Sequence, residues 1–151
     1  MEPRASSESL GLLLRLVHQH WNQAIKAALE EAGFGDVPPS HANVFAFVPP
    51  EGIRVSELTT VAHARKQTVT EAVQELEKLG YLRRRTDRTD RRAKLVFLSL
   101  KGQAIRPIAM AAGKQVGESW AALTSPEDIE ILRKTLRDLM THLATTDEHK
   151  S

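Results

Sequence analysis

The stretch Arg83-Arg84-Arg85-Thr86-Asp87-Arg88-Thr89-Asp90-Arg91-Arg92-Ala93-Lys94 carries six Arg and one Lys against two Asp, a local formal charge of +5. The whole chain of 151 residues has a formal charge of only +2, so its positive charge is concentrated here. Apolar runs flank the stretch on both sides, Leu79-Gly80-Tyr81-Leu82 before it and Leu95-Val96-Phe97-Leu98-Ser99-Leu100 after it. Such a concentration of charge favours a polyanionic partner, most simply a nucleic-acid backbone.

The residues around the basic stretch predict a β-hairpin with a long, charged tip. Residues 81–85 and 94–100 have the composition of two short strands, and residues 86–93 between them are polar and turn-prone. The tip lacks an Asn-Gly or Asp-Gly pair, so we expect a wide loop and not a two-residue turn. A basic stretch can also be a solvated face or a flexible RNA-binding arm, but the framing apolar runs favour an ordered hairpin.

Helices are predicted on both sides of the hairpin. Apolar residues recur at three- and four-residue spacing over residues 9–32, which is typical of one helix face. Two short helices are expected next, with Ser40 and Ser56 as their N-caps, and a fourth helix over residues 66–79 that ends at Gly80. Two long helices follow the hairpin, from residue 101 to 123 and from 126 to 144, the last with Ser125 as its cap.

Composition excludes several classes of site and protein. The chain has no Cys, which excludes disulfides, thiolate metal sites and Cys nucleophiles. Aromatic residues make up 5% of the chain, too few for a platform that stacks single-stranded bases. No apolar stretch approaches the ~18 residues of a membrane span. Residues 1–8 lack the pattern of a signal peptide, so a cytoplasmic protein is expected.

Enzymatic motifs are missing from the sequence. No Gly-rich phosphate loop follows a predicted strand, and neither a Gly-x-Ser-x-Gly turn nor a recognisable pair of carboxylates is present. We therefore expect neither an enzyme nor a bound cofactor.

The order of the predicted elements indicates a helix-turn-helix followed by a wing. The third and fourth helices are joined by His63-Ala64-Arg65, and the basic hairpin comes directly after them. The major groove of B-DNA admits one α-helix, and the flanking phosphates attract cations. The fourth helix begins with polar side chains that suit that groove: Arg65, Lys66, Gln67, Thr68 and Thr70. An Arg at a hairpin tip is slim enough for the adjacent minor groove, and the tip supplies Arg88, Arg91 and Arg92.

Four stretches of the chain resemble the MarR family of bacterial transcriptional regulators. The most specific is Asp87-Arg88-Thr89-Asp90-Arg91-Arg92-Ala93-Lys94, which is similar to that family's wing pattern Asp-x-x-Asp-Arg-Arg-x-Lys. In the family a strand and Leu-Ser/Thr-x-x-Gly follow, as Leu98-Ser99-Leu100-Lys101-Gly102 does here. The other three are Val55-Ser56-Glu57-Leu58, Thr68-Val69-Thr70-Glu71-Ala72-Val73 and Leu76-Glu77-Lys78-Leu79-Gly80-Tyr81-Leu82. In length and element order the resemblance runs from about residue 10 to 143.

The resemblance implies a mostly α fold of the α+β winged-helix type. A helix-turn-helix lobe with a β-hairpin wing would occupy residues 40–100. Residues 1–39 and 101–151 would form a helical dimerisation bundle, in which the first and the last two helices of two subunits interlock. The fourth helix would be the recognition helix, Arg91 the wing residue at the minor groove, and Asp90 a support that orients the wing arginines by a salt bridge.

The chain departs from the family pattern near the recognition helix. His63 occupies a turn position where the family often has Gly, and Arg65 stands where a Ser, Thr or Asp cap is common. Glu71 stands where many members carry Arg, and its carboxylate would repel phosphate or accept from a cytosine amine.

An effector pocket is implied between the dimerisation helices and the DNA-binding lobe. His18, Trp21, His41 and Phe45 fall in that region of the family, where a small aromatic or phenolic effector would contact them. A zinc site without Cys would need three or four convergent His or carboxylate ligands. The sequence has no His-x-x-x-His pair, and no metal site is expected.

The sequence therefore predicts a ligand-responsive homodimeric regulator, a repressor, that binds a near-palindromic site in double-stranded DNA. The alternative is a winged-helix interaction module that binds protein or other acidic partners without reading DNA sequence. Steep salt dependence together with a strong preference for one DNA sequence would distinguish the regulator from the module.

Overall fold

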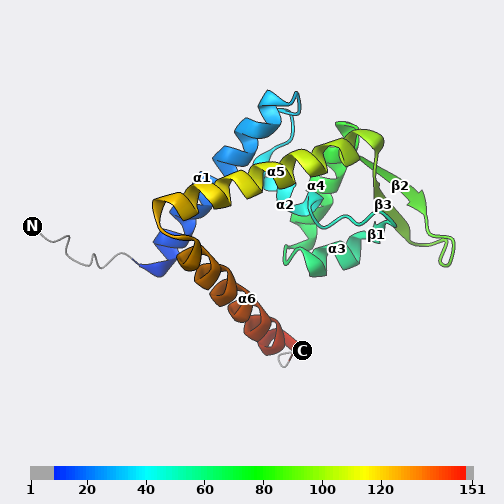
Figure 1. The fold of residues 1–151 in the computed structure, drawn as a ribbon. Helices are drawn as coiled ribbons and strands as arrows, with labels where there is room; N and C mark the ends of the chain where they lie inside the picture. The colour runs from blue at the N-terminus through cyan, green and yellow to red at the C-terminus, as the bar shows by residue number, and fades with distance from the viewer. Residues whose placement is uncertain (1–8, 149–151) are drawn as a thin grey trace, which may run out of the picture. The chain divides into compact units, whose positions relative to one another are not determined.

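The computed structural model describes residues 9–148, which are mostly helical with one small sheet (Figure 1). The chain divides after Ala112 into two compact units. The prediction that residues 1–8 lack a signal peptide lies outside the described residues. In chain order the elements are α1 (Leu10–Glu31), α2 (Pro39–Phe45), β1 (Ile53–Arg54), α3 (Val55–Val61), α4 (Lys66–Lys78), β2 (Leu82–Thr86), β3 (Lys94–Leu98), α5 (Leu100–Leu123) and α6 (Pro126–Glu148).

The mostly helical winged fold predicted from the sequence is confirmed. The assignment of residues 1–39 and 101–151 to a dimerisation region stays a prediction. Across residues 9–148, every helix is too short or too polar to span a bilayer.

The core of the first unit forms around the apolar stripe of α4. Val69, Ala72, Val73 and Leu76 recur at helical spacing and are buried, as the periodicity predicts. Tyr81 packs beside this stripe, where the edge of its ring meets Phe45 at a centroid distance of 6.2 Å. Its hydroxyl donates to the carboxylate of Asp36. Burial, together with that carboxylate, raises the pKa of the Tyr81 hydroxyl above its ordinary range.

The predicted hairpin is confirmed as β2 and β3, which pair in antiparallel register from Leu82 opposite Leu98 to Thr86 opposite Lys94. Leu82, Val96 and Leu98 alternate onto the buried face. A third strand, β1, pairs with the other edge of β3 and was not predicted, because two residues are too few for an alternating pattern. Ser99 and Leu100, predicted as strand, lie outside β3, because Ser99 begins the turn into α5.

A network of hydrogen bonds at Ser99 joins the end of β3 to the turn after α4 and to the start of α5. The backbone N–H of Ser99 donates to the carbonyl oxygen of Tyr81 at 3.0 Å, and its Oγ donates to the carbonyl oxygen of Gly80 at 2.5 Å. The same Oγ accepts from the backbone N–H of Gly102 at 3.0 Å. Gly102 lies so close to the Tyr81 carbonyl that a Cβ there would overlap the oxygen. The Leu-Ser-x-x-Gly pattern therefore connects three parts of the lobe: the end of β3, the turn after α4 and the first turn of α5.

Two of the predicted helix starts are wrong. Ser40 and Ser56 lie inside α2 and α3, which begin at Pro39 and Val55 without a side-chain cap. Pro suits the first helical turn because its ring fixes φ, and α2 therefore starts two residues earlier than a cap at Ser40 would give. At α3 the chain passes directly from β1 into the helix, so the pairing of Arg54 sets the start.

The last predicted start is confirmed: the backbone N–H of Asp128 donates to Ser125 Oγ at 3.0 Å. The helix that begins there, α6, runs on to Glu148, beyond the predicted end at residue 144.

We expect Gly102→Ala to destabilise the first unit by about 1–3 kcal/mol, the usual result of forcing an extra carbon into a packed site. Gly117→Ala is the matched control on the same helix, because a Cβ there meets nothing within 4 Å. That control should gain up to about 1 kcal/mol of helix propensity. Denaturant unfolding measures both, and equal effects for the two variants would contradict the close contact at Gly102.

Candidate nucleic-acid interface

The turn before α4 holds one residue in a left-handed backbone conformation. His63 has φ 50, in the left-handed region that residues with a side chain seldom adopt, although Asn, Asp and His adopt it more often than the others. Gly takes this conformation without a steric cost. Arg65 then stands at the N-cap without a side-chain cap, and α4 begins at Lys66, where the sequence predicted it.

The exposed face of α4 carries the predicted DNA-reading residues. Arg65, Lys66, Gln67 and Thr68 are exposed, and Thr70 is half-buried. The Gln67 side-chain amide donates to the carboxylate of Glu71 at 3.1 Å, one turn further along the helix. Glu71 therefore holds one end of the Gln67 side chain along the exposed face of the helix.

The tip of the wing is a compact loop shaped by main-chain bonds. The backbone N–H of Asp87 donates to the carbonyl oxygen of Ala93 at 3.0 Å and closes the base of the loop. Asp90 accepts from the backbone N–H of Arg92 at 3.0 Å. The structure thus gives Asp90 a role through the main chain, and its salt bridge to the wing arginines stays a prediction. The side chains of Arg88, Arg91 and Arg92 are exposed on this loop.

An ion pair ties the base of the wing to β1. Arg54 donates from Nε at 3.1 Å and from Nη2 at 2.8 Å to one carboxylate oxygen of Asp87. The other oxygen accepts from the backbone N–H of Thr89 at 2.9 Å and from its hydroxyl at 2.8 Å. The Asp87 side chain is only 11% exposed, and these donors satisfy both of its oxygens.

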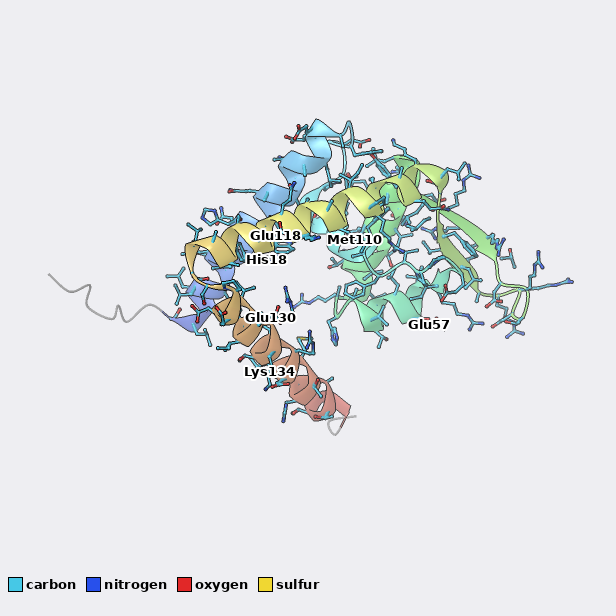
Figure 2. All side chains as sticks on the ribbon, viewed as in Figure 1. His18, Glu57, Met110, Glu118, Glu130 and Lys134 are labelled. Carbon is cyan, nitrogen blue, oxygen red and sulfur yellow. The ribbon has the colours of Figure 1, made fainter. Side chains whose placement is uncertain are left out.

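The surroundings of Asp87 stabilise its charged form. The Thr89 backbone N–H, then the Arg54 guanidinium, lower the pKa of Asp87 to about 2. The bond to Asp87 raises the pKa of Arg54, and the nearby carboxylates of Asp90 and Glu57 add to this effect. Glu57 is exposed on α3 (Figure 2). Sequence reasoning missed Arg54 because its place beside the wing depends on β1.

Two of the three stem arginines, Arg84 and Arg85, make contacts within the protein. Arg84 donates from Nε to the carboxylate of Glu77 on α4 at 2.6 Å. The Arg85 guanidinium lies 4.1 Å from the centroid of the Phe97 ring, in a cation–π contact. The basic stretch therefore divides into a stem that packs on the sheet and α4, and a tip whose arginines face solvent.

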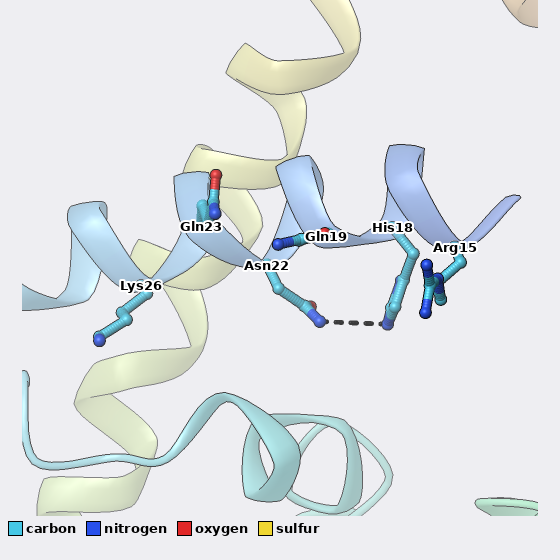
Figure 3. A pocket seen from close by; sticks show the side chains of 6 residues that line it. All are labelled: Arg15, His18, Gln19, Asn22, Gln23 and Lys26. Carbon is cyan, nitrogen blue, oxygen red and sulfur yellow. Dashed lines mark hydrogen bonds between the residues drawn. The ribbon is translucent and has the colours of Figure 1, made fainter. Parts of the chain in front are cut away.

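The structure gives the four predicted effector residues different surroundings. His18 Nε2 accepts from the side-chain amide of Asn22 at 3.1 Å and lines a shallow hollow whose other walls are also α1 side chains (Figure 3). Trp21 is half-buried on the same helix. Phe45 is 5% exposed and belongs to the core, so it reaches a ligand only if the core opens. His41 Nε2 lies 2.7 Å from Glu75 Oε2 and links α2 to α4.

Metal-ligating side chains do not gather in the described part of the chain. Within residues 9–148, no three His, Asp or Glu side chains come close enough to hold an ion together.

We expect Asp87→Asn to lower stability at neutral pH and to flatten its acid dependence. A carboxylate with a pKa of about 2, below its ordinary 3.8, contributes stability that is present above pH 4 and lost as the pH falls toward 2. Denaturant unfolding of the wild type and the variant from pH 7 to pH 2 measures the free energy of unfolding at neutral pH and its dependence on pH. A double-mutant cycle with Arg54→Gln should show coupling, and strictly additive losses would contradict the ion pair.

Comparison with known proteins relates the sequence and the fold to one family. A model of the MarR family matches residues 36–93. The chain is 28% identical to the transcriptional regulator HosA of Escherichia coli over 102 residues, which are 68% of this chain and 76% of that protein. It is 32% identical to the HTH-type transcriptional regulator PrsX of Escherichia coli over 89 residues, 58% of this chain and 53% of that protein.

Solved structures share the fold over nearly the whole chain. A crystal structure of MarR is similar with a TM-score of 0.77, 20% identity and coverage of 98% of this chain and 99% of that one. A probable transcriptional regulator from Pseudomonas aeruginosa gives a TM-score of 0.71, 25% identity and coverage of 87% and 97%. The S. aureus MepR–DNA complex gives a TM-score of 0.71, 15% identity and coverage of 90% and 99%.

The matched residues contain the helix-turn-helix and the charged tip of the wing, the two parts that carry the exposed polar and basic side chains. On the sequence match and the shared fold together, the chain belongs to the MarR family of winged helix-turn-helix transcriptional regulators, a family of DNA-binding proteins that are not enzymes.

Proposed function

We propose that this DNA-binding regulator is a ligand-responsive homodimeric repressor of a near-palindromic site. In this proposal α4 enters the major groove, and an Arg of the β2–β3 loop enters the adjacent minor groove. The observation that carries the proposal is that one lobe presents both an exposed polar helix start and an exposed arginine-rich loop.

The start of α4 supports a reading role. The side chains of Lys66, Gln67 and Thr68 are exposed, and the buried stripe on the opposite face fixes the helix to the lobe. A Gln amide can donate to and accept from an adenine edge, and a Lys can contact guanine or a phosphate. The bond from Gln67 to Glu71 orders the amide before DNA arrives, which lowers the entropy lost on binding.

The wing supports a minor-groove role. Its base is held by the Arg54–Asp87 ion pair, and its tip is ordered by the main-chain bonds at Asp90. Arg91 lies at this ordered tip and is exposed, so we assign it the contact with the minor groove. Arg88 and Arg92 are assigned to the neighbouring phosphates.

Exposed apolar side chains support a dimer. On α1, Leu10, Leu13, Leu14 and Val17 are each more than 40% exposed. On α6, a row at helical spacing is exposed in the same way: Ile131, Leu132, Leu136, Leu139, Met140 and Leu143. Rows of large apolar side chains rarely face water in a monomer, and a second copy of the chain would cover them.

The ligand response would act through the distance between two recognition helices. Paired recognition helices must lie about 34 Å apart to enter successive major grooves on one face of the duplex. A ligand shifts this spacing only if its affinity differs between the two states. The His41–Glu75 bond between α2 and α4 is the described contact that would carry such a change to the reading helix.

Selection of bound fragments from random-sequence duplex DNA tests the proposal. The purified protein should enrich one near-palindrome with half-sites about one helical turn apart, and its affinity should fall steeply with salt. Recovery of no enriched sequence would favour the alternative function, a winged-helix module that binds protein or other acidic partners.

We expect Arg91→Ala to weaken binding to the enriched duplex by about tenfold or more, since one good groove contact is worth about 1–3 kcal/mol. Dimer formation and unfolding temperature should not change, because the side chain is exposed at the tip of the loop. Arg133→Ala removes the same charge from an exposed site on α6 and serves as the control. An unchanged affinity of the Arg91 variant in a gel-shift titration would refute the wing assignment.

We expect Leu136→Asp to convert the dimer to a monomer, because the dimer would otherwise bury an unpaired charge. Light scattering coupled to size-exclusion chromatography measures the mass in solution. Thr141→Asp adds the same charge to another exposed position of α6, on the opposite side from the apolar row, and should leave the dimer intact. A dimeric mass for the Leu136 variant would place the interface elsewhere.

A further inference from the structure

A charged cleft separates the second half of α4 from the stem of the hairpin. It is lined by Gln74, Glu77, Lys78, Arg84 and Lys94, that is, by three cationic side chains against one carboxylate. The predicted DNA-reading residues at the start of α4 and at the wing tip do not include any of these five. The roles predicted so far therefore leave this cleft without a function.

The strand register explains why two of these cations face α4. Arg84 pairs with Val96, and Lys94 pairs with Thr86, two positions further along the hairpin. Side chains two residues apart lie on the same face of a strand, so Arg84 and Lys94 share the face on which Val96 is buried. That face packs toward α4, as the 2.6 Å contact from Arg84 to Glu77 shows.

The cleft continues the exposed face of the reading helix. Gln67, Glu71, Gln74 and Lys78 follow one another at spacings of three or four residues, which places them in one row along α4. All four are exposed. The row begins at the predicted base-reading residues and ends in the cleft.

The geometry of a DNA duplex indicates what could bind in the cleft. A major groove and the neighbouring minor groove are separated by one sugar-phosphate strand. A lobe that places α4 in the first and the wing in the second must have that strand pass between α4 and the hairpin. The cleft opens between those two elements, and its charge is complementary to phosphate.

We propose that this cleft binds the phosphates of the DNA strand that runs between the two grooves, with Lys94 and Arg84 as the phosphate ligands. This inference rests on the proposed function. Glu77 then has an opposing role, because it holds Arg84 in the free protein and would repel the incoming phosphate. An ion pair between side chains that are 28% and 43% exposed contributes little, so a phosphate can take Arg84 from Glu77.

The salt dependence of DNA binding tests whether Lys94 and Arg84 contact phosphates. The probe is the duplex that the wild-type protein enriches from random DNA, and a scrambled duplex is measured beside it. Each lost phosphate contact should reduce the slope of log affinity against log salt by about 0.9. We expect that reduction for Lys94→Gln and for Arg84→Gln, and an equal loss of affinity on both duplexes, because phosphates carry no sequence information.

Arg83→Gln is the matched control. It removes the same charge from the same strand, one residue away from Arg84 and on the opposite face of the sheet. Its slope should equal that of the wild type. A slope reduced equally by all three substitutions would indicate general electrostatic attraction and would overturn the assignment to the cleft.

Glu77→Gln separates a phosphate site from a structural ion pair. If Glu77 competes with DNA for Arg84, the variant should bind DNA several-fold more tightly and with a steeper salt slope. If the pair only stabilises the hairpin, the variant should unfold at lower temperature without tighter binding, and this result would overturn the proposal. Wild-type slopes for both Lys94→Gln and Arg84→Gln would also overturn it, whereas failure of the wild type to enrich any duplex would refute the proposed function instead.

Discussion

The close approach of Gly102 to the carbonyl oxygen of Tyr81 is the constraint on which the rest of the lobe depends. At this point the turn after α4, the end of β3 and the first turn of α5 meet within a few residues. Only a residue without a Cβ lets α5 come so near the Tyr81 backbone. The Ser99 hydroxyl donates to Gly80 and accepts from Gly102, so one side chain connects the turn after α4 to the start of α5.

The structure shows that the cations of the basic stretch differ in what they contact. Twelve consecutive residues carry seven of the 21 Lys and Arg residues, but the fold gives these cations different contacts. Arg85 lies on the Phe97 ring, Arg84 is held by Glu77, and the three tip arginines face solvent. The net local charge favours attraction to DNA, whereas the fold holds two of these cations in contacts within the protein.

Most of the fold could be predicted from the sequence because its signals are local. The stripe on α4, the cap at Ser125 and the alternation in the hairpin are each set by neighbours within a few residues. The predictions from sequence missed features that depend on contacts between residues far apart in the chain. The strand β1 exists only because β3 lies beside it, and Arg54 becomes part of the wing for the same reason. Phe45 packs in the core beside Tyr81, far along the chain, and its predicted role at an effector pocket stays a prediction.

The pairing of Asp87 has a consequence for how the wing responds to its solvent. A carboxylate with a pKa of about 2 stays ionised at neutral and mildly acidic pH, so its ion pair with Arg54 persists over that range. Ionic strength, in contrast, acts on every exposed arginine of the tip at once. Attraction between the tip and a polyanion is therefore sensitive to salt, whereas the partly buried ion pair at the base of the wing is screened much less.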